Sequence, residues 1–106
     1  MRKILALLLF VTAISSVEAQ SFNANGKITR LHFWEGHSGL LIIHEDMVNK
    51  EDCARIDFYM LRKEHPFFRE FYSLLLAAHI AGQPVRFGLR GCSEGFPSVV
   101  HVYSDK

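Results

Sequence analysis

One segment with helical periodicity, residues 67–81, interrupts a chain whose other apolar segments have the pattern of β-strands. Pro66 precedes this segment, at a position where its missing N–H would have no helical partner, and Gly82 follows its last residue. Pro84 then prevents the helix from resuming. With a single helix in this position, most of the core must come from strands.

Five segments have a strand-forming composition or alternate between apolar and polar residues. They are residues 27–34, 40–44, 53–61, 85–90 and 98–103. Three strands, one helix and two more strands suit a single domain, residues 20–106. The order predicts a mainly β fold with one helix (β-β-β-α-β-β), an OB-fold-like small five-stranded barrel whose helix plugs one end. An open α+β sheet with the helix packed on one face is the alternative.

The N-terminal residues 1–19 have the pattern of a secretory signal peptide. A basic start, Arg2 and Lys3, precedes an apolar run at 4–14, and small residues occupy the −3 and −1 positions of a cleavage site before Gln20. The apolar run is shorter than the roughly 20 residues needed to span a bilayer. We therefore expect a soluble exported protein, periplasmic or secreted, with no membrane span.

The charge balance argues against two classes of partner. The chain carries 12 Lys and Arg and 11 Asp and Glu, and ten of each remain without the two basic residues and the one acidic residue of segment 1–19. A formal charge near zero does not attract nucleic acid or an anionic membrane surface. We therefore expect neither as a partner.

Export also determines how the two cysteines are interpreted. Cys53 and Cys92 would meet an oxidising compartment, in which thiols at compatible positions pair. We predict one disulfide between them, whose loop would stabilise the fold by about 4 kcal/mol in the chain-entropy model. Two separate buried thiols are the alternative.

The corner between the predicted helix and the fourth predicted strand carries the sharpest motif of the chain. Residues 71–78 lead into Gly-Gln-Pro-Val-Arg at 82–86, and Gly-Lys-Ile at 26–28 opens the first predicted strand. With these motifs and the positions of Cys53 and Cys92, most of the mature chain resembles the B subunit of subtilase cytotoxin and related small exported proteins.

This resemblance implies an OB-fold without enzymatic activity, a glycan-binding surface on the barrel, and assembly as a homo-oligomeric ring. It also implies that the helix faces neighbouring subunits or an effector subunit. The sialic-acid-binding toxins of this family have a serine just before the glycine that opens the first strand, and this chain has Asn25 there. Its amide can donate and accept hydrogen bonds, so Asn25 is a candidate ligand-binding residue.

Other candidate ligand-binding residues lie on the predicted strands, where most of the aromatic residues are expected to be core. Trp34, beside a turn glycine, and Tyr59, on the mixed face of the third strand, are the best candidates for exposed stacking platforms. Arg55 is a candidate because guanidinium groups bind carboxylate-bearing sugars in bidentate fashion. Four arginines could cluster in the fold and together suit such a sugar: Arg30, Arg55, Arg86 and Arg90.

The outward side of the predicted helix is less polar than a solvated helix face. It carries Leu76 and Ile80 together with Arg69 and Ser73. We expect these four residues to form an interface with a partner.

Metal binding and catalysis are the less favoured chemistries. The histidines on predicted strands are His32, His44 and His101. They lack the His-x-His and HExxH spacings of zinc sites, so we expect no metal and no cofactor. Ser38 and Ser93 lack the GxSxG elbow of a hydrolase, and His37-Ser38 fits a turn between strands.

The sequence therefore favours an exported non-catalytic binding module that recognises a glycan or a protein partner and can self-assemble. A monomeric periplasmic interaction or inhibitor protein is the alternative, and a small hydrolase acting through Ser38 or His37 is a third hypothesis.

Overall fold

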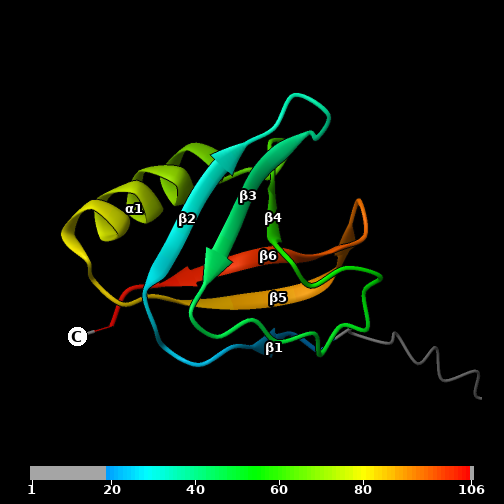
Figure 1. Ribbon diagram of the computed structural model, residues 1–106, viewed down its shortest axis with the longest axis horizontal. Helices are drawn as coiled ribbons and strands as arrows, with labels where there is room; N and C mark the ends of the chain where they lie inside the picture. Colours follow the sequence, from blue (N-terminus) through cyan, green and yellow to red (C-terminus); the bar gives the residue numbers. More distant parts are fainter. Residues whose placement is uncertain (1–18, 106) are drawn as a thin grey trace, which may run out of the picture.

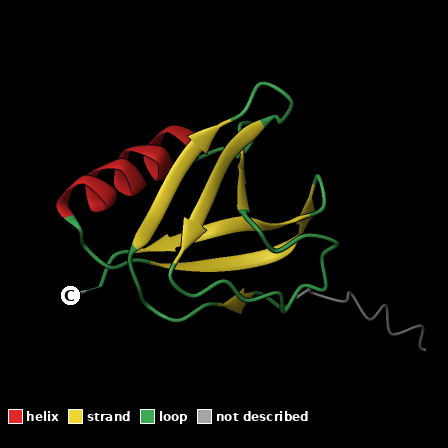
Figure 2. Cartoon of the chain, in the orientation of Figure 1, coloured by secondary structure: helices red, strands yellow, loops and turns green. Residues whose placement is uncertain are grey.

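The computed structural model describes residues 19–105, so the predicted signal peptide, apart from Ala19, lies outside the described residues. Six strands and one helix form this part of the chain (Figures 1 and 2). They are β1 (Ser21–Phe22), β2 (Ile28–Phe33), β3 (Gly39–His44), β4 (Tyr59–Arg62), α1 (Phe68–Ala81), β5 (Arg86–Ser93) and β6 (Phe96–Tyr103). Over residues 19–105, the structure contains no helix with the length and apolar character of a membrane span.

The strands form one sheet in the order β1-β5-β6-β4-β3-β2. Neighbours pair in antiparallel fashion except β4 and β6, which run parallel and meet at Met60 and Ser98. Figure 1 shows β2 and β3 running across the direction of β5 and β6, with α1 alongside β2. The predicted mainly β fold with one helix is confirmed.

The predicted five-stranded barrel is wrong, because the sheet has six strands and is not closed. The extra strand, β1, pairs with the free edge of β5, where Ser21 lies opposite Leu89. That edge is therefore not available to β2. A single isolated bridge, Gly26 to Val85, joins the segments that precede β2 and β5, with N···O distances of 3.0 and 2.7 Å.

The third predicted strand, residues 53–61, is shorter than expected, since β4 begins only at Tyr59. The backbone N–H of Arg55 donates to the carbonyl oxygen of Gly95 at 2.8 Å instead of to a strand partner. Residues 53–58 consequently follow the β5–β6 turn and not the sheet ladder. Residues 53–58 therefore lie outside the sheet, where the alternation of side chains along a strand does not apply.

Helix α1 confirms the predicted helix to within one residue. Gly82 ends it with a φ of 65°, a left-handed conformation that glycine adopts without a steric clash. Leu75 and Ala78 are buried against the inner side of the sheet. The strand and loop residues that complete this main core are Ile28, Leu40, Ile42, Tyr59, Leu61, Val85, Phe87, Leu89 and Val99.

A buried histidine links the segments that precede β2 and β5. His44 is 2% exposed, and its Nε2 donates to the carbonyl oxygens of Gly26 and Val85, both at 2.8 Å. Its Nδ1 accepts from the backbone N–H of Asp46 at 2.9 Å and from the side-chain amide of Asn23 at 3.1 Å. A neutral imidazole with its hydrogen on Nε2 satisfies all four contacts, so His44 has a structural role.

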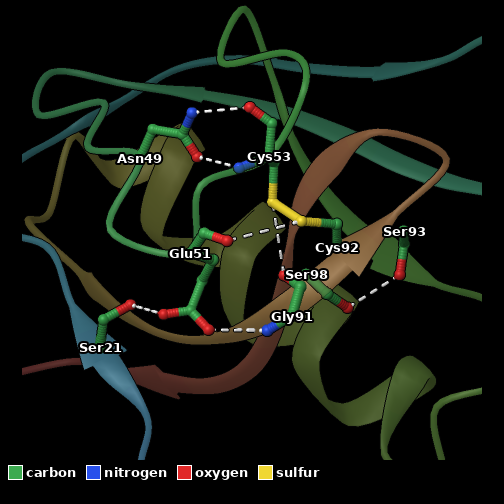
Figure 3. Close-up of a disulfide and its surroundings, with 8 residues drawn as sticks. All are labelled: Ser21, Asn49, Glu51, Cys53, Gly91, Cys92, Ser93 and Ser98. Atoms are coloured by element: carbon green, nitrogen blue, oxygen red, sulfur yellow. Dashed lines mark hydrogen bonds between the residues drawn. A yellow bond between two sulfur atoms is a disulfide. The ribbon is translucent and has the colours of Figure 1, made fainter.

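The predicted disulfide between Cys53 and Cys92 is present, with a Cα–Cα distance of 5.7 Å. Figure 3 shows Glu51 beside it: one carboxylate oxygen accepts from the hydroxyl of Ser21, and the other accepts from the backbone N–H of Gly91 at 2.7 Å. The disulfide and Glu51 together tie the segment before β4 to β1 and β5. A disulfide of this kind is compatible with an exported protein.

Candidate functional site

The two faces of β3 and β4 have different environments, because successive strand residues point to opposite sides of a sheet. Leu40 and Leu61 point into the main core beneath α1. Leu41 and Met60 point the other way and form a small second cluster with Phe96, the first residue of β6. Among residues 19–105, no helical residue joins this second cluster.

Aromatic side chains extend the second cluster outward to solvent. Phe96 meets the edge of Phe58 at a centroid distance of 6.0 Å, and Phe58 meets His32 at 5.3 Å. His32 stacks on Trp34 at 5.4 Å and 23°, while His37 packs edge-on against Phe96 at 5.4 Å. Exposure rises along this series from 0% at Phe96 to 59% at Trp34. We call the following set the aromatic face: His32, Trp34, His37, Arg55, Phe58 and Phe96.

Arg55 supplies the positive charge of the aromatic face. Its Cζ lies 4.6 Å from the centroid of the Phe96 ring, and Nε and one terminal nitrogen donate to the two carboxylate oxygens of Asp57. These hydrogen bonds hold the pKa of Asp57 below its usual value. The guanidinium is thereby fixed over the ring, with half of the side chain still exposed and further N–H donors available to a ligand.

Glu94 joins the β2–β3 loop to the β5–β6 turn. Its Oε2 accepts from the backbone N–H and the hydroxyl of Ser38, both at 3.1 Å, and the backbone contact contributes most to lowering the pKa of Glu94. Its Oε1 lies 3.6 Å from Nδ1 of His37, too far for a hydrogen bond, and this buried Nδ1 has no partner among residues 19–105. We call the two hydrogen bonds between Glu94 and Ser38 the clasp. The clasp fixes the loop that follows Trp34, while Nδ1 of His37 forms no hydrogen bond with the described residues.

A shallow depression of about 470 Å³ adjoins Trp34. Its size falls within the range of about 300–1,000 Å³ that is usual for small-ligand sites. Its lining combines aromatic rings with one acidic, one basic and one imidazole side chain. The lining residues are Phe33, Trp34, Glu35, His37, Gly39 and Lys63.

Of the four predicted ligand-binding residues, the structure brings Trp34 and Arg55 to the aromatic face and places Asn25 elsewhere. Asn25 is exposed, but it precedes β2 whereas Trp34 follows it. A strand of this length separates the two residues by about 20 Å, at about 3.3 Å per residue. Asn25 and Trp34 therefore cannot contact one small ligand together.

The expectation that Tyr59 is an exposed platform is wrong. Tyr59 lies opposite Ile42 on the inner face and is fully buried in the main core. Its hydroxyl accepts from the backbone N–H of Val48 at 2.8 Å and donates toward the carbonyl oxygen of Asp46 at 3.1 Å. Burial raises the pKa of Tyr59 above its usual value of 10.0. Tyr59 and Leu61 share one face, as alternation predicts, but that face packs in the main core and does not point outward.

The strand arginines do not form a single cluster. Arg86 lies near the C-terminus, where it pairs with Asp105 at 3.3 Å and stacks on the Tyr103 ring at 4.5 Å. Arg55 is held on the aromatic face by Asp57, and Arg90 lines a different pocket.

The four predicted interface residues do share one exposed side of α1. Arg69, Ser73, Leu76 and Ile80 follow one another at spacings of four, three and four residues, which places them along one stripe of the helix. Leu76 is 39% exposed and Ile80 is 77% exposed. The stripe is therefore an apolar surface flanked by polar groups.

The two serines considered as nucleophiles contact no histidine in the hydrogen bonds of the described residues. The Ser38 hydroxyl donates to Glu94, and the Ser93 hydroxyl donates to Ser98 at 2.9 Å. Residues 19–105 also contain no group of three His, Cys, Asp or Glu side chains arranged to hold a metal ion. The geometry of the aromatic face offers stacking, hydrogen bonding and one positive charge, which are means of binding.

No ligand-binding role was predicted for four residues of the aromatic face, which are His32, His37, Phe58 and Phe96, or for the adjacent Glu94. One signal was available, since His32 and Trp34 are two residues apart in an extended segment and so share a face of the sheet. The others come from separate segments that meet only in the folded chain.

Comparison of the chain with models of known protein families, with curated proteins and with solved structures finds no match. The resemblance to toxin B subunits consequently stays a prediction, and a function has to be argued from the geometry of the site.

Proposed function

We propose that this protein is an exported, non-catalytic binding module that recognises a glycan through the aromatic face. The observation that carries the proposal is the Trp34 ring, 59% exposed and stacked on His32, at the edge of the aromatic face. An exposed tryptophan held in place by a second ring is a rigid apolar platform.

The neighbours of Trp34 suit a sugar. A sugar ring presents an apolar face of C–H groups together with hydroxyls, and it needs both a ring to stack on and polar groups at its edge. Glu35, His37 and Lys63 supply polar groups in the adjoining depression, and Arg55 supplies a cation on the other side of the face. An acidic sugar would gain a charge-assisted bond from Arg55.

The position of the face is a second support. The β2–β3 loop and the β5–β6 turn meet beside the outer face of β3 and β4 through Glu94 and Ser38. Loops held by a rigid scaffold are where binding residues are disproportionately found. Export is supported by the residue pattern of 1–19 and is compatible with the disulfide.

A glycan array tests this proposal. The chain is expressed from its full coding sequence, purified in oxidised form and applied as wild type, Trp34→Ala and Phe67→Ala. Phe67 is the matched control because it is 57% exposed and lies outside the aromatic face. We expect wild type and Phe67→Ala to bind the same glycans, and Trp34→Ala to lose them, because the loss of a stacking platform weakens binding about tenfold or more.

Retention of every glycan by Trp34→Ala would contradict the proposal, as would a wild-type protein that binds none. Loss on Phe67→Ala with retention on Trp34→Ala would move glycan recognition to another surface.

The exposed stripe on α1 favours a second proposal, self-assembly through the helix. Large apolar side chains at Leu76 and Ile80 would be covered by a neighbouring subunit, as the resemblance to ring-forming toxin subunits implies. A monomer that acts on another protein is the alternative.

Size-exclusion chromatography with light scattering distinguishes the two. A ring that dissociates in Leu76→Asp while the circular-dichroism spectrum is preserved would support assembly. A wild-type protein that is monomeric at all concentrations would contradict self-assembly. Ser73→Asp, on the polar part of the same stripe, is the control that shows whether an added charge alone disrupts the oligomer.

A further inference from the structure

A second depression, of about 480 Å³, shares no lining residue with the aromatic face. Its lining comes from the end of β4, the turn before α1, the first turn of α1, and strands β5 and β6. The lining residues are Arg62, His65, Pro66, Phe67, Phe71, Arg90, Val100 and His101. None of them is acidic, and the nearby Glu64 and Glu70 are exposed and do not line it.

Two arginines flank the floor of this pocket. In the sheet β6 lies between β4 and β5 (Figure 1), so Arg62 and Arg90 approach Val100 and His101 from opposite sides. Both arginines are exposed, and within residues 19–105 neither forms a salt bridge. They differ in this from Arg55 and Arg86, each of which is paired with an aspartate.

His65 lines the same pocket. Burial lowers the pKa of His65, and the charge of Arg62 lowers it further. Its Nδ1 accepts a hydrogen bond from the backbone N–H of Phe67 at 3.1 Å, which fixes the ring in the pocket wall. The pocket therefore concentrates positive charge in a chain whose basic and acidic residues nearly balance.

Apolar rings form the other wall. The centroids of His65 and Phe71 are 4.8 Å apart, and those of Phe67 and Phe71 are 6.1 Å apart. Phe67 is 57% exposed although two rings pack beside it. An exposed aromatic ring next to two unpaired arginines offers an apolar surface and an anion site in one pocket.

We propose that this pocket binds a phosphate monoester carried on an aromatic or other ring-bearing small molecule. Arg62 and Arg90 hold the phosphate oxygens, since the planar guanidinium matches a phosphate in bidentate fashion, and two cations match a dianion better than a single negative charge. The exposed ring of Phe67 packs against the organic part. This site is separate from the proposed glycan site and does not depend on it.

Isothermal titration calorimetry with phenyl phosphate at pH 7.5 tests the proposal, because a phosphate monoester with a second pKa near 6 is mainly dianionic there. Benzoate, inorganic phosphate and benzyl alcohol are the comparison probes. We expect phenyl phosphate to bind saturably and most tightly of the four. Arg62→Gln and Arg90→Gln should each weaken it about tenfold, as expected for loss of a charge-assisted hydrogen bond.

Arg30→Gln is the matched control, because Arg30 is an exposed strand arginine outside both pockets. It should bind phenyl phosphate like the wild type, as should Trp34→Ala, which keeps this test independent of the glycan proposal. The melting temperature of each variant shows that it is folded, and either arginine variant alone suffices for the comparison.

Three results would overturn the proposal. The first is an absence of saturable binding by phenyl phosphate. The second is binding of any comparison probe as tight as that of phenyl phosphate. The third is a loss of binding in Arg30→Gln equal to that in Arg62→Gln and Arg90→Gln, which would show a response to net charge.

Discussion

The inner face of β3 and β4, which packs beneath α1, and their outer face, which carries the aromatic face, differ in how far side chains are buried and polar atoms are hydrogen-bonded. On the inner face, Tyr59 is fully buried with its hydroxyl bonded to two backbone groups, and Leu75 of α1 covers it within the same core. On the outer face, the aromatic series ends in an exposed Trp34, and Nδ1 of His37 is buried without a hydrogen-bond partner.

This difference separates stability from recognition. Buried apolar contacts and satisfied hydrogen bonds stabilise a fold, whereas exposed rings contribute little to it and remain available to a ligand. Substitutions on the inner face should therefore reduce the free energy of unfolding, and those on the outer face should reduce binding.

The largest expected loss of stability comes from removing the disulfide that attaches the segment before β4, which contains Arg55, to β5. The double substitution Cys53→Ala, Cys92→Ala releases a loop with a sequence separation of 39 residues. We expect the free energy of unfolding to fall by about 4 kcal/mol, measured by urea denaturation. A loss below about 1 kcal/mol would show that the segment before β4 is held by its hydrogen bonds alone.

The second prediction compares neighbouring leucines of α1. Leu75→Ala should cost about 3 kcal/mol, because it leaves a cavity in the main core. Leu76→Ala, at a 39% exposed position, should cost less than about 1 kcal/mol, and Trp34→Ala on the outer face should behave in the same way. Equal losses at Leu75 and Trp34 would contradict the distinction between the two faces.

Tyr59→Phe should reduce the free energy of unfolding by about 1–2 kcal/mol, because the backbone N–H of Val48 loses its acceptor. Burial raises the folded-state pKa of Tyr59 above 10.0, so the unfolded chain loses this proton first as the pH rises. Native stability should therefore decline above about pH 10. This decline should be smaller in Tyr59→Phe, and an identical alkaline decline in both proteins would show that other groups cause it.

The smallest effect concerns the clasp beside Trp34. The pKa of Glu94 is lowered by its bonds to Ser38, so the clasp is complete above the ordinary value of 4.5 and is lost as the pH falls through the lower folded-state value. Trp34 emission should change over that acidic range in the wild type. In Glu94→Ala the emission should already resemble the acidic form at pH 6, and an acid transition that persists in this variant would assign it to another group.

Local signals made part of this structure predictable. The helix was predictable because Pro66, Gly82 and Pro84 mark its ends independently of the rest of the fold. The disulfide was predictable because the chain has two cysteines and an export signal pattern. The exposure of Trp34 was predictable because a turn glycine follows it closely.

The remainder depends on contacts between distant segments. β1 is two residues long and has no periodicity, and it is positioned by neighbours such as Asn23, whose side-chain oxygen accepts from the N–H of Phe87, 64 residues away. Residues 53–58 leave the sheet where Arg55 bonds to Gly95, and Tyr59 is buried by its pairing with Ile42 and by the main core. Phe58, Phe96 and Glu94 reach the candidate site only through these same contacts.

The aromatic face can be tested directly because Trp34 is the only tryptophan of the chain. The measurement is a fluorescence titration of the oxidised protein with the glycan that the array selects, accompanied by calorimetry of the same mixture. The account predicts a saturable change in Trp34 emission whose midpoint equals the calorimetric dissociation constant. Calorimetric binding that leaves the emission unchanged would contradict it.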